Sequence, residues 1–254
     1  MSLSSRLDGQ TAFITGASSG LGARFAEVLA RAGAKVAVAA RRTDRLNALA
    51  THIESFDGRA VPVSCDVTDV NSIRAAFDKA ETELGPISIV INNSGVSAQK
   101  KATDVTPEEY DFIFNTNTKG AFFVAQEGAK RMIQHGLQGR IVNIASVAGL
   151  RVIGQLSVYC MSKAAVVQMT KAMALEWARY GINVNAICPG YIETEINAAY
   201  WGTEGGKRLV ESLPRKRVGE AKYLDSALML LASGEESRFI NGAILTVDDG
   251  TSVM

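Results

Sequence analysis

Seven short apolar segments alternate with longer amphipathic segments along the 254 residues of this chain. The short segments lie at residues 11–15, 35–40, 60–64, 87–92, 140–145, 182–187 and 243–247. They are apolar along most of their length, which is typical of strands in a parallel sheet covered on both faces. Apolar residues at helical spacing predict helices over 21–32, 44–56, 70–84, 107–134 (with a bend) and 158–180. Repeated strand-helix-strand units predict an α/β fold, a doubly wound parallel sheet of seven strands with helices on both faces.

The alternation shows no linker or repeat, so residues 1–254 are predicted to form a single domain. One segment, at about 192–220, breaks the rhythm between the sixth and seventh strands. It carries Tyr200 and Trp201, and it ends in a basic run around Pro214. Long irregular segments in compact domains commonly cover a substrate. We expect a substrate lid here, with an ordinary pair of surface helices as the alternative.

The composition argues against several kinds of binding partner. The chain has 27 Lys and Arg against 26 Asp and Glu, which indicates neither a nucleic-acid groove nor an anionic membrane surface. Its three scattered cysteines argue against a disulfide framework and favour a reducing compartment. The two histidines lie far apart, so no metal site is predicted. No apolar stretch approaches the roughly 18 residues of a membrane span, and we expect a cytoplasmic protein.

A glycine-rich run follows the first predicted strand and opens the first predicted helix. It reads Thr15-Gly16-Ala17-Ser18-Ser19-Gly20-Leu21-Gly22, with the spacing G-x-x-x-G-x-G. Glycines here permit a tight turn and the close approach of a pyrophosphate, whose charge meets the amides of the helix N-terminus. We therefore predict that a dinucleotide binds Gly16, Ser18, Ser19, Gly20, Leu21 and Gly22.

The end of the second predicted strand indicates which dinucleotide binds. An acidic residue there would hold the ribose 2′-hydroxyl of NAD, whereas an arginine suits a 2′-phosphate. The strand ends at Ala40 and is followed by Arg41 and Arg42. A guanidinium matches phosphate geometry, so NADP(H) is the predicted cofactor. Asp44 comes later and is better explained as a first-turn residue favoured by the helix dipole.

Two further loops follow the third and fourth predicted strands, on the side of the sheet where ligands bind. Asp66 and Val67 are candidates to meet the adenine, although a turn or capping role fits Asp66 equally well. The run from Asn93 through Ser94 to Gly95 is a candidate to line the cofactor.

Tyr159 and Lys163 stand four residues apart in a predicted helix, with Ser146 thirteen residues before the tyrosine. An i,i+4 spacing puts the phenol and the ammonium on one helix face. A free tyrosine has a pKa of about 10, and a nearby positive charge favours the phenolate. Such a tyrosine can exchange a proton with a substrate oxygen. A Tyr-x-x-x-Lys pair is common on helices and is a weak signal of catalysis by itself. The other motifs in this chain strengthen the catalytic interpretation.

Together these motifs resemble those of the short-chain dehydrogenase/reductase family, in its single-domain branch. The resemblance covers nearly the whole chain, from the glycine-rich turn through the N-N-S-G run at 92–95 to the Y-x-x-x-K pair. It implies a Rossmann-type fold and hydride transfer between a nicotinamide and a carbonyl or alcohol carbon. Asp249 replaces a glycine that is usual in the family; aspartate tolerates the left-handed region better than most residues.

The resemblance also implies roles for single residues. Tyr159 donates or removes the substrate proton, Ser146 positions the substrate oxygen, and Lys163 biases the tyrosine toward ionisation and holds the nicotinamide ribose. Asn117 is implied to support a water that resupplies the proton, with a helix-bend role as the compatible alternative. The nicotinamide end is implied to contact Pro189, Gly190, Ile192 and Thr194.

Several functions remain open at this point. The leading hypothesis is an NADP(H)-dependent reductase of a ketone or aldehyde. A 3-oxoacyl-carrier-protein reductase is the nearest rival, since the basic residues at 215–217 could meet an acidic carrier. A sugar or polyol dehydrogenase is a further alternative, and a catalytically silent NADP(H)-binding regulator is the alternative of another class.

The long predicted helices carry apolar residues on more than one face, as at Ala164, Ala165, Val167 and Met169. A face buried between subunits would explain this. The family resemblance implies a homo-oligomer, and we expect a tetramer rather than a dimer.

Overall fold

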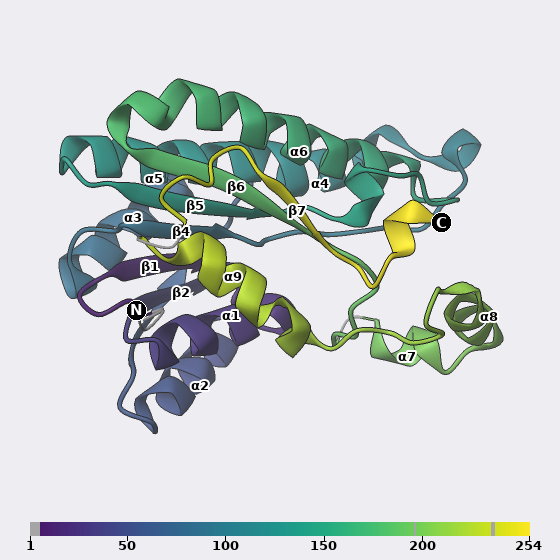
Figure 1. The fold of residues 1–254 in the computed structure, drawn as a ribbon, viewed down its shortest axis with the longest axis horizontal. Helices are drawn as coiled ribbons and strands as arrows, with labels where there is room; N and C mark the ends of the chain where they lie inside the picture. The colour runs from purple at the N-terminus through teal and green to yellow at the C-terminus, as the bar shows by residue number, and fades with distance from the viewer. Residues whose placement is uncertain (1–5, 196, 235–236) are drawn as a thin grey trace.

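The seven apolar segments pair into one parallel sheet, as the sequence predicts (Figure 1). The computed structural model describes residues 6–195, 197–234 and 237–254. The strands are β1 (Thr11–Thr15), β2 (Lys35–Ala40), β3 (Arg59–Ser64), β4 (Ile89–Asn92), β5 (Gly139–Ile144), β6 (Ile182–Pro189) and β7 (Ile244–Val247). Their spatial order is β3-β2-β1-β4-β5-β6-β7. The winding therefore reverses between β1 and β4, and ligands bind at such a reversal in sheets of this kind.

Helices cover both faces of the sheet (Figure 1). One face is packed by α1 (Gly20–Arg31), α2 (Thr43–Glu54) and α9 (Asp225–Ala232). The other is packed by α3 (Val70–Leu84), α5 (Ala121–Gln134) and α6 (Ser157–Trp177), with α4 (Pro107–Phe114) against α6. No helix in the described ranges is both long and apolar enough to cross a membrane.

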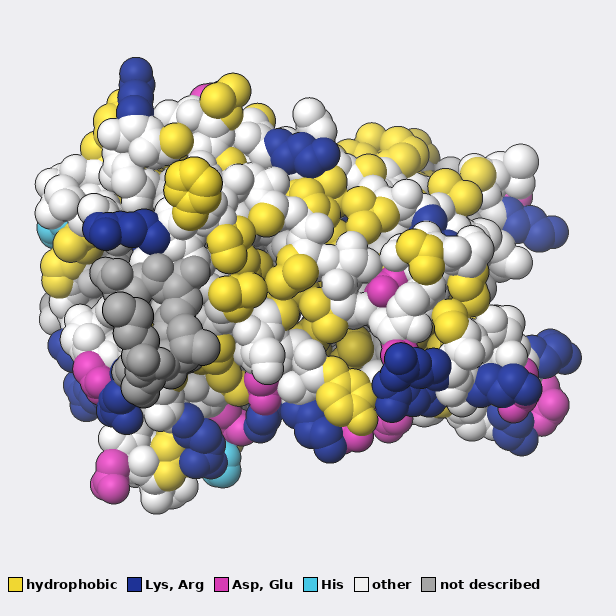
Figure 2. Space-filling model, viewed as in Figure 1, with side chains coloured by type: hydrophobic (Ala, Val, Ile, Leu, Met, Phe, Trp, Pro, Cys, Tyr) yellow, Lys and Arg dark blue, Asp and Glu magenta, His cyan; other side chains and the backbone are white. Residues whose placement is uncertain are grey.

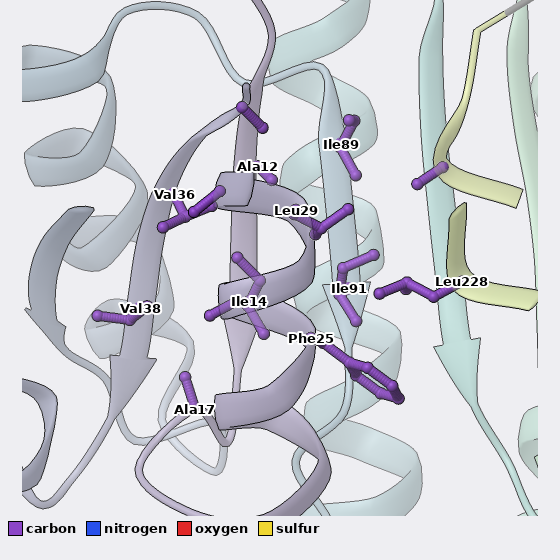
Figure 3. Close-up of a cluster of buried hydrophobic side chains, with 14 of the residues drawn as sticks. Ala12, Ile14, Ala17, Phe25, Leu29, Val36, Val38, Ile89, Ile91 and Leu228 are labelled. Carbon is purple, nitrogen blue, oxygen red and sulfur yellow. The ribbon is translucent and has the colours of Figure 1, made fainter. Parts of the chain in front are cut away.

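The strands are apolar throughout because each of their faces is buried. On β1, Ile14 points toward α1, where Figure 3 shows it near Phe25 and Leu29. Phe13 points to the opposite face and stacks on Phe77 of α3, with ring centroids 4.1 Å apart. Burying a large apolar side chain contributes about 1.5–3 kcal/mol, so these two layers hold the helices on the sheet.

The segment predicted as one bent helix over 107–134 is interrupted. Its first part, α4, begins with Pro107 behind a capping box in which Thr106 and Glu109 bond each other's backbone. A π-helical turn over Asn115–Gly120 then separates α4 from α5. Gly120 lies so close to the strand-end loop after β3 that a Cβ there would sit 2.8 Å from the Val67 oxygen. π-Helical turns of this kind frequently occur at functional sites.

The irregular segment at 192–220 contains two short helices, α7 (Ala198–Trp201) and α8 (Glu204–Ser212), while residue 196 lies outside the described residues. These helices lie apart from the sheet (Figure 1). The base of the segment is closed by a bridge in which the Glu193 amide donates to Gly219 at 2.8 Å. The sequence did not predict α9, and the other boundaries differ from prediction by up to three residues, as helix and strand ends commonly do.

Candidate functional site

The loops after β1, β2, β4, β5 and β6 open on one edge of the sheet because all the strands are parallel. The residues that the sequence predicts to act on a cofactor or substrate lie in these loops, in the loop after β3, at the last residue of β6, at the nearby turns of α1 and α6, or in the π-helical turn. The fold therefore brings together groups that are up to 178 residues apart, from Gly16 to Thr194 (194 − 16).

The glycine-rich turn has the geometry that its sequence predicts. Gly16 and Gly20 have φ angles of 67° and 56°, in the left-handed region that favours glycine. A Cβ on Gly22 would lie 2.6 Å from Asn93 Nδ2 and 2.7 Å from the Gly16 carbonyl carbon. The N-cap residue of α1, Ser19, makes no side-chain cap. The first amides of α1 therefore remain available to an anion such as a pyrophosphate.

Thr15 and Asn93 fix this turn against β4. The Thr15 hydroxyl oxygen accepts hydrogen bonds from the amides of Asn93 and Ser94, both at 3.0 Å. The Asn93 side chain donates in return to the Thr15 carbonyl at 3.0 Å. The sequence indicated Thr15 only as the start of the glycine-rich run. The signal that could have revealed its hydrogen-bonding role is a threonine at the end of an apolar strand, where its side chain is buried.

Arg42 lies directly against the glycine-rich turn. Its guanidinium donates to the Ser18 hydroxyl at 2.9 and 3.2 Å and to the Ser19 hydroxyl at 2.8 Å. Arg41 is exposed on the same loop, and its charge helps to lower the pKa of Asp66. Asp44 lies in the first turn of α2, as its assignment to the helix dipole requires. Arg41 and Arg42 therefore both lie in the loop after β2, where the sequence predicts contact with a 2′-phosphate.

Asp66 is mainly a turn-forming residue. Its carboxylate accepts from the Thr68 amide at 3.0 Å and from the Thr68 hydroxyl at 2.8 Å. The bond from the Thr68 amide is the largest cause of the lowered pKa of Asp66. Val67 is buried beside it and contacts the π-helical turn. The turn alternative is thus realised, while the N-cap of α3 is Asp69, and the backbone of 66–67 still lies at the ligand edge of the sheet.

Ser146, Tyr159 and Lys163 meet where β5 and α6 come together. Ser146 follows β5 and caps the short turn Val147–Gly149, where its hydroxyl oxygen accepts from the Ala148 amide at 3.1 Å. The Ser146 side chain lies close enough to the Tyr159 phenol to lower its pKa. Lys163 is buried, and its Nζ donates to the Ile144 carbonyl at 2.8 Å, 5.8 Å from the centre of the Tyr159 ring.

The pKa values of this trio differ from the simple expectation. Burial raises the pKa of Tyr159, and the nearby Ser146 side chain offsets this only in part. Burial also lowers the pKa of Lys163 to about 8. The sequence led us to expect that the charge of Lys163 lowers the pKa of Tyr159. In this structure burial has the larger effect on that pKa. The reason is that desolvation disfavours both charged forms, and the ammonium is engaged by a carbonyl.

Asn117 lies in the π-helical turn and is almost fully buried. Its Oδ1 accepts from the Val96 amide at 2.7 Å, and its Nδ2 donates to the Val96 carbonyl at 2.9 Å and the Ser162 hydroxyl at 3.0 Å. A Cβ on Gly95 would lie 3.4 Å from both Asn117 Oδ1 and Lys163 Nζ. Asn117 thus ties the loop after β4 to α6, as its helix-bend role requires. The sequence did not indicate that Asn117 bonds Val96 and Ser162, because no local sequence pattern predicts contacts between such distant residues.

The loop after β6 completes the edge. Pro189 ends β6, and a Cβ on Gly190 would lie 2.7 Å from the Asp248 Cα, so only glycine fits there. Thr194 lies against the glycine-rich turn, with its Cβ 3.6 Å from the Cβ position of Gly20. Ile192 is buried at the base of the lid segment.

Cys160 and Cys188 are buried packing residues, as the sequence indicates. Burial raises the pKa of the Cys188 thiol to about 11, so it is no nucleophile at neutral pH. Within the described residues, no three His, Cys, Asp or Glu side chains gather in a way that could hold a metal ion. The arrangement can therefore offer a tyrosine and a serine hydroxyl to a substrate oxygen, beside a turn that can hold a dinucleotide.

Comparison with known proteins gives concordant matches. The family model for the short chain dehydrogenases matches residues 10–205. D-threitol dehydrogenase of Mycolicibacterium smegmatis is 35% identical over 248 residues, covering 98% of this chain and 95% of the relative. Gluconate 5-dehydrogenase of Gluconobacter oxydans is 35% identical over 248 residues, covering 97% and 96%.

A solved structure shows the same fold. The gluconate 5-dehydrogenase of Burkholderia cenocepacia, in complex with NADP and tartrate, is 35% identical to this chain and superposes with a TM-score of 0.93. The match covers 98% of each of the two chains. The likeness therefore extends over the sheet, the covering helices and the lid segment alike.

Proposed function

Because this chain belongs to the short-chain dehydrogenase family, we propose that the residues gathered at the edge of its sheet interconvert a ketone and a secondary alcohol with NADP(H). The chain is an oxidoreductase with a Rossmann-type α/β fold, as the sequence predicts. What remains to be argued is which of its residues bind the cofactor, which act on the substrate, and what the substrate is.

The cofactor is proposed to run along the edge of the sheet from β2 to β6. Arg41 and Arg42 would hold the 2′-phosphate, and Asp66 and Val67 would border the adenine. The glycine-rich turn would hold the pyrophosphate through Gly16, Ser18, Ser19, Gly20, Leu21 and Gly22. The nicotinamide half would lie among Asn93, Ser94, Gly95, Tyr159, Lys163, Pro189, Gly190, Ile192 and Thr194. The NADP in the solved relative supports this, as does the Arg42 guanidinium that binds Ser18 and Ser19.

When bound, NADP(H) supplies or accepts the hydride. Tyr159 is the proposed proton donor to the substrate oxygen in reduction and the acceptor in oxidation. Ser146 is proposed to hold that oxygen beside the phenol by a second hydrogen bond. Lys163, whose pKa of about 8 keeps it mainly protonated at neutral pH, would bring a positive charge close to the tyrosine. Asn117 is a positioning residue that holds Val96 and Ser162 in place.

The observation that carries the proposal is the meeting of Ser146, Tyr159 and Lys163, in which the buried Lys163 Nζ lies 5.8 Å from the centre of the Tyr159 ring and Ser146 stands close enough to the phenol to affect its pKa. Its test is the oxidation of NADPH, followed by absorbance, with a panel of ketones, 3-oxoacyl thioesters and keto sugars. NADP+ reduction with polyols and sugar acids tests the reverse direction. Turnover with at least one class is expected. Binding of NADPH without any turnover would support a non-catalytic regulator instead.

Polyols and sugar acids are the substrate class that we favour within this panel. The two relatives named above act on D-threitol and gluconate by their names. The rival function as a carrier-protein reductase needs free basic residues at 215–217. Arg217 donates to Asp249 at 2.8 Å, Arg215 lies 3.4 Å from it, and Lys216 pairs with Glu211 at 3.0 Å.

Basic and acidic side chains stand side by side over the end of the molecule that carries α8 (Figure 2). Asp249 and Glu211 thus offset two of the three positive charges of the 215–217 run, which weakens the case for an acidic carrier. The segment 192–220 is proposed to be the substrate lid, because its base follows Gly190 and contains Thr194, both of which are proposed cofactor contacts.

The 2′-phosphate assignment predicts the effect of Arg41→Ala. Loss of one charge-assisted hydrogen bond of about 1.5–3 kcal/mol corresponds to about 10- to 100-fold weaker NADPH binding. The affinity for NADH, which has no 2′-phosphate, should change little. Fluorescence titration with both cofactors measures this. Arg59→Ala, at the start of β3 and on the opposite edge of the sheet, is the matched control. Equal losses for NADPH and NADH would contradict the assignment.

We further propose that this chain forms a homo-oligomer, a tetramer rather than a dimer, through the outer face of α5 and α6. A groove of about 660 Å³ lies between these helices, lined mainly by apolar side chains that include Phe122, Met169 and Trp177. Leu175 of α6 is 82% exposed on the same helix. Large contiguous apolar patches on a protein surface commonly mark an interaction site.

This assembly predicts that Phe122→Glu separates the subunits, because burying an unpaired carboxylate in the groove is costly. A lower mass is expected by light scattering at micromolar concentration. Thr82→Glu on the exposed side of α3 is the control and should keep the mass of the parent protein. A parent protein that is itself monomeric would refute the assembly.

A cytoplasmic location is also proposed. It rests on Cys65, Cys160 and Cys188, all buried as free thiols, which suits a reducing compartment.

A further inference from the structure

An exposed ion pair joins two segments that are 150 residues apart in the sequence. Arg45, on the first turn of α2, donates through Nη1 to both carboxylate oxygens of Glu195, at 2.9 and 2.7 Å. Glu195 belongs to the lid stem, by which we mean residues 192–195 between β6 and the lid helices. The pair therefore links the loop region after β2 to the loop region after β6.

The neighbours of both partners touch the glycine-rich turn. On one side, Arg42 binds the Ser18 and Ser19 hydroxyls. On the other side, Thr194 lies against Gly20. The Arg45–Glu195 pair therefore joins the two segments that contact the glycine-rich turn. Because Gly20 and Thr194 are both proposed cofactor contacts, such a bridge crosses the path of the dinucleotide.

Hydrogen bonds to Asn197 tie the lid stem to α7. The Thr194 amide donates to Asn197 Oδ1 at 2.7 Å, and Asn197 Nδ2 donates to the Ile192 carbonyl at 2.9 Å. Trp201 of α7 donates its indole N–H to the same Asn197 oxygen at 3.2 Å. A movement of Glu195 is thus coupled through one asparagine to the base of the lid and to α7.

Charge also matters at this position. The hydrogen bonds from Arg45 lower the pKa of Glu195, and the more distant Arg42 adds to the effect. Without Arg45, the Glu195 carboxylate would remain as an unpaired negative charge near the arginines proposed for the 2′-phosphate. Arg45 neutralises that charge and leaves Arg41 and Arg42 for the cofactor.

We propose that Arg45 and Glu195 are positioning residues that close the lid stem over bound NADP(H) and slow its release. This inference rests on the cofactor site proposed above. The two partners remain 41% and 57% exposed, so water and salt have access to the pair and it can open during each turnover.

A double-mutant cycle tests this inference. NADPH release is followed by stopped-flow fluorescence for the parent protein, Arg45→Ala, Glu195→Gln and the double variant. Arg45→Ala is expected to speed release about two- to fivefold, as an exposed pair supports. Glu195→Gln should have a smaller effect, because it leaves no unpaired carboxylate near the 2′-phosphate. The double variant should resemble Glu195→Gln rather than show the sum of both effects.

Two further readouts separate this role from general loosening of the fold. The differences should vanish at 1 M salt, which screens exposed charges. The KM for NADPH should rise without a fall in kcat. Glu204→Gln, which removes an ion pair with Lys207 inside α8, is the matched control and should release NADPH at the parent rate.

The outcomes also distinguish this inference from the function on which it rests. A parent protein that does not bind NADPH would overturn both. If NADPH binds and dissociates from all four proteins at the same rate, the role of the Arg45–Glu195 pair is overturned and the proposed function is not. Slower release from Glu195→Gln would mean that the carboxylate competes with the 2′-phosphate, which is the opposite of the proposed role.

Discussion

Tyr159→Phe is expected to lower kcat about 10²- to 10⁴-fold, the range that a positioned proton donor contributes. The hydroxyl is the only group removed, and the ring keeps its place in α6. Since burial raises the pKa of Tyr159, the phenol is protonated at neutral pH and ready to donate. The affinity for NADPH should change little, because the glycine-rich turn and the arginines are untouched.

Steady-state assays with the best substrate of the panel and a fluorescence titration of NADPH measure the two quantities. Tyr180→Phe, on the short turn that ends α6, removes an equivalent hydroxyl far from Ser146 and should keep the parent activity. Turnover by Tyr159→Phe within a few fold of the parent protein would exclude the tyrosine as the proton donor.

Gly22→Ala should have the second large effect, on cofactor binding. An added methyl group would lie 2.6 Å from Asn93 Nδ2 and 2.7 Å from the Gly16 carbonyl carbon, well inside van der Waals contact. The turn would have to move away from α1, which removes the amides from an approaching pyrophosphate. We expect NADPH to bind at least about 100-fold more weakly, since roughly 2.7 kcal/mol of charge-assisted contacts is at stake.

The same substitution should lower the free energy of unfolding by about 1–3 kcal/mol, as overpacking does in tightly packed sites. Urea denaturation measures this. Gly234→Ala is the control, because a Cβ there would meet, among the described residues, only a side-chain nitrogen of Arg140, at 4.0 Å. A variant of Gly22 that binds NADPH normally would show that the turn does not hold the pyrophosphate.

The parts of the molecule that the sequence predicts well depend on local patterns. The strands follow from short apolar runs such as the one that contains Ile14, and the glycine-rich turn follows from its spacing and its place ahead of a helix. The i,i+4 spacing is by itself enough to put Tyr159 and Lys163 on one helix face. Ser146 joins them only through the family resemblance.

The features that the sequence did not predict depend on contacts between distant segments. The eight residues of α9 are too short to show helical periodicity, and they are held by burying Leu228 and Leu231 against the sheet. The raised pKa of Tyr159 follows from burial, which no spacing reveals. The pairing of Arg45 with Glu195 likewise appears only when β2 and β6 are placed in one sheet.

The π-helical turn over Asn115–Gly120 belongs to two surfaces at once. Its inner side carries Asn117, which bonds Val96 and Ser162, while Thr118 and Lys119 on its outer side line the apolar groove of α5 and α6. One turn of backbone therefore separates the groove from the hydrogen bonds that surround Lys163. A substitution in the groove that moves this turn would therefore also move Asn117 and the residues that it positions. The candidate active site consequently limits which side chains the groove can accept.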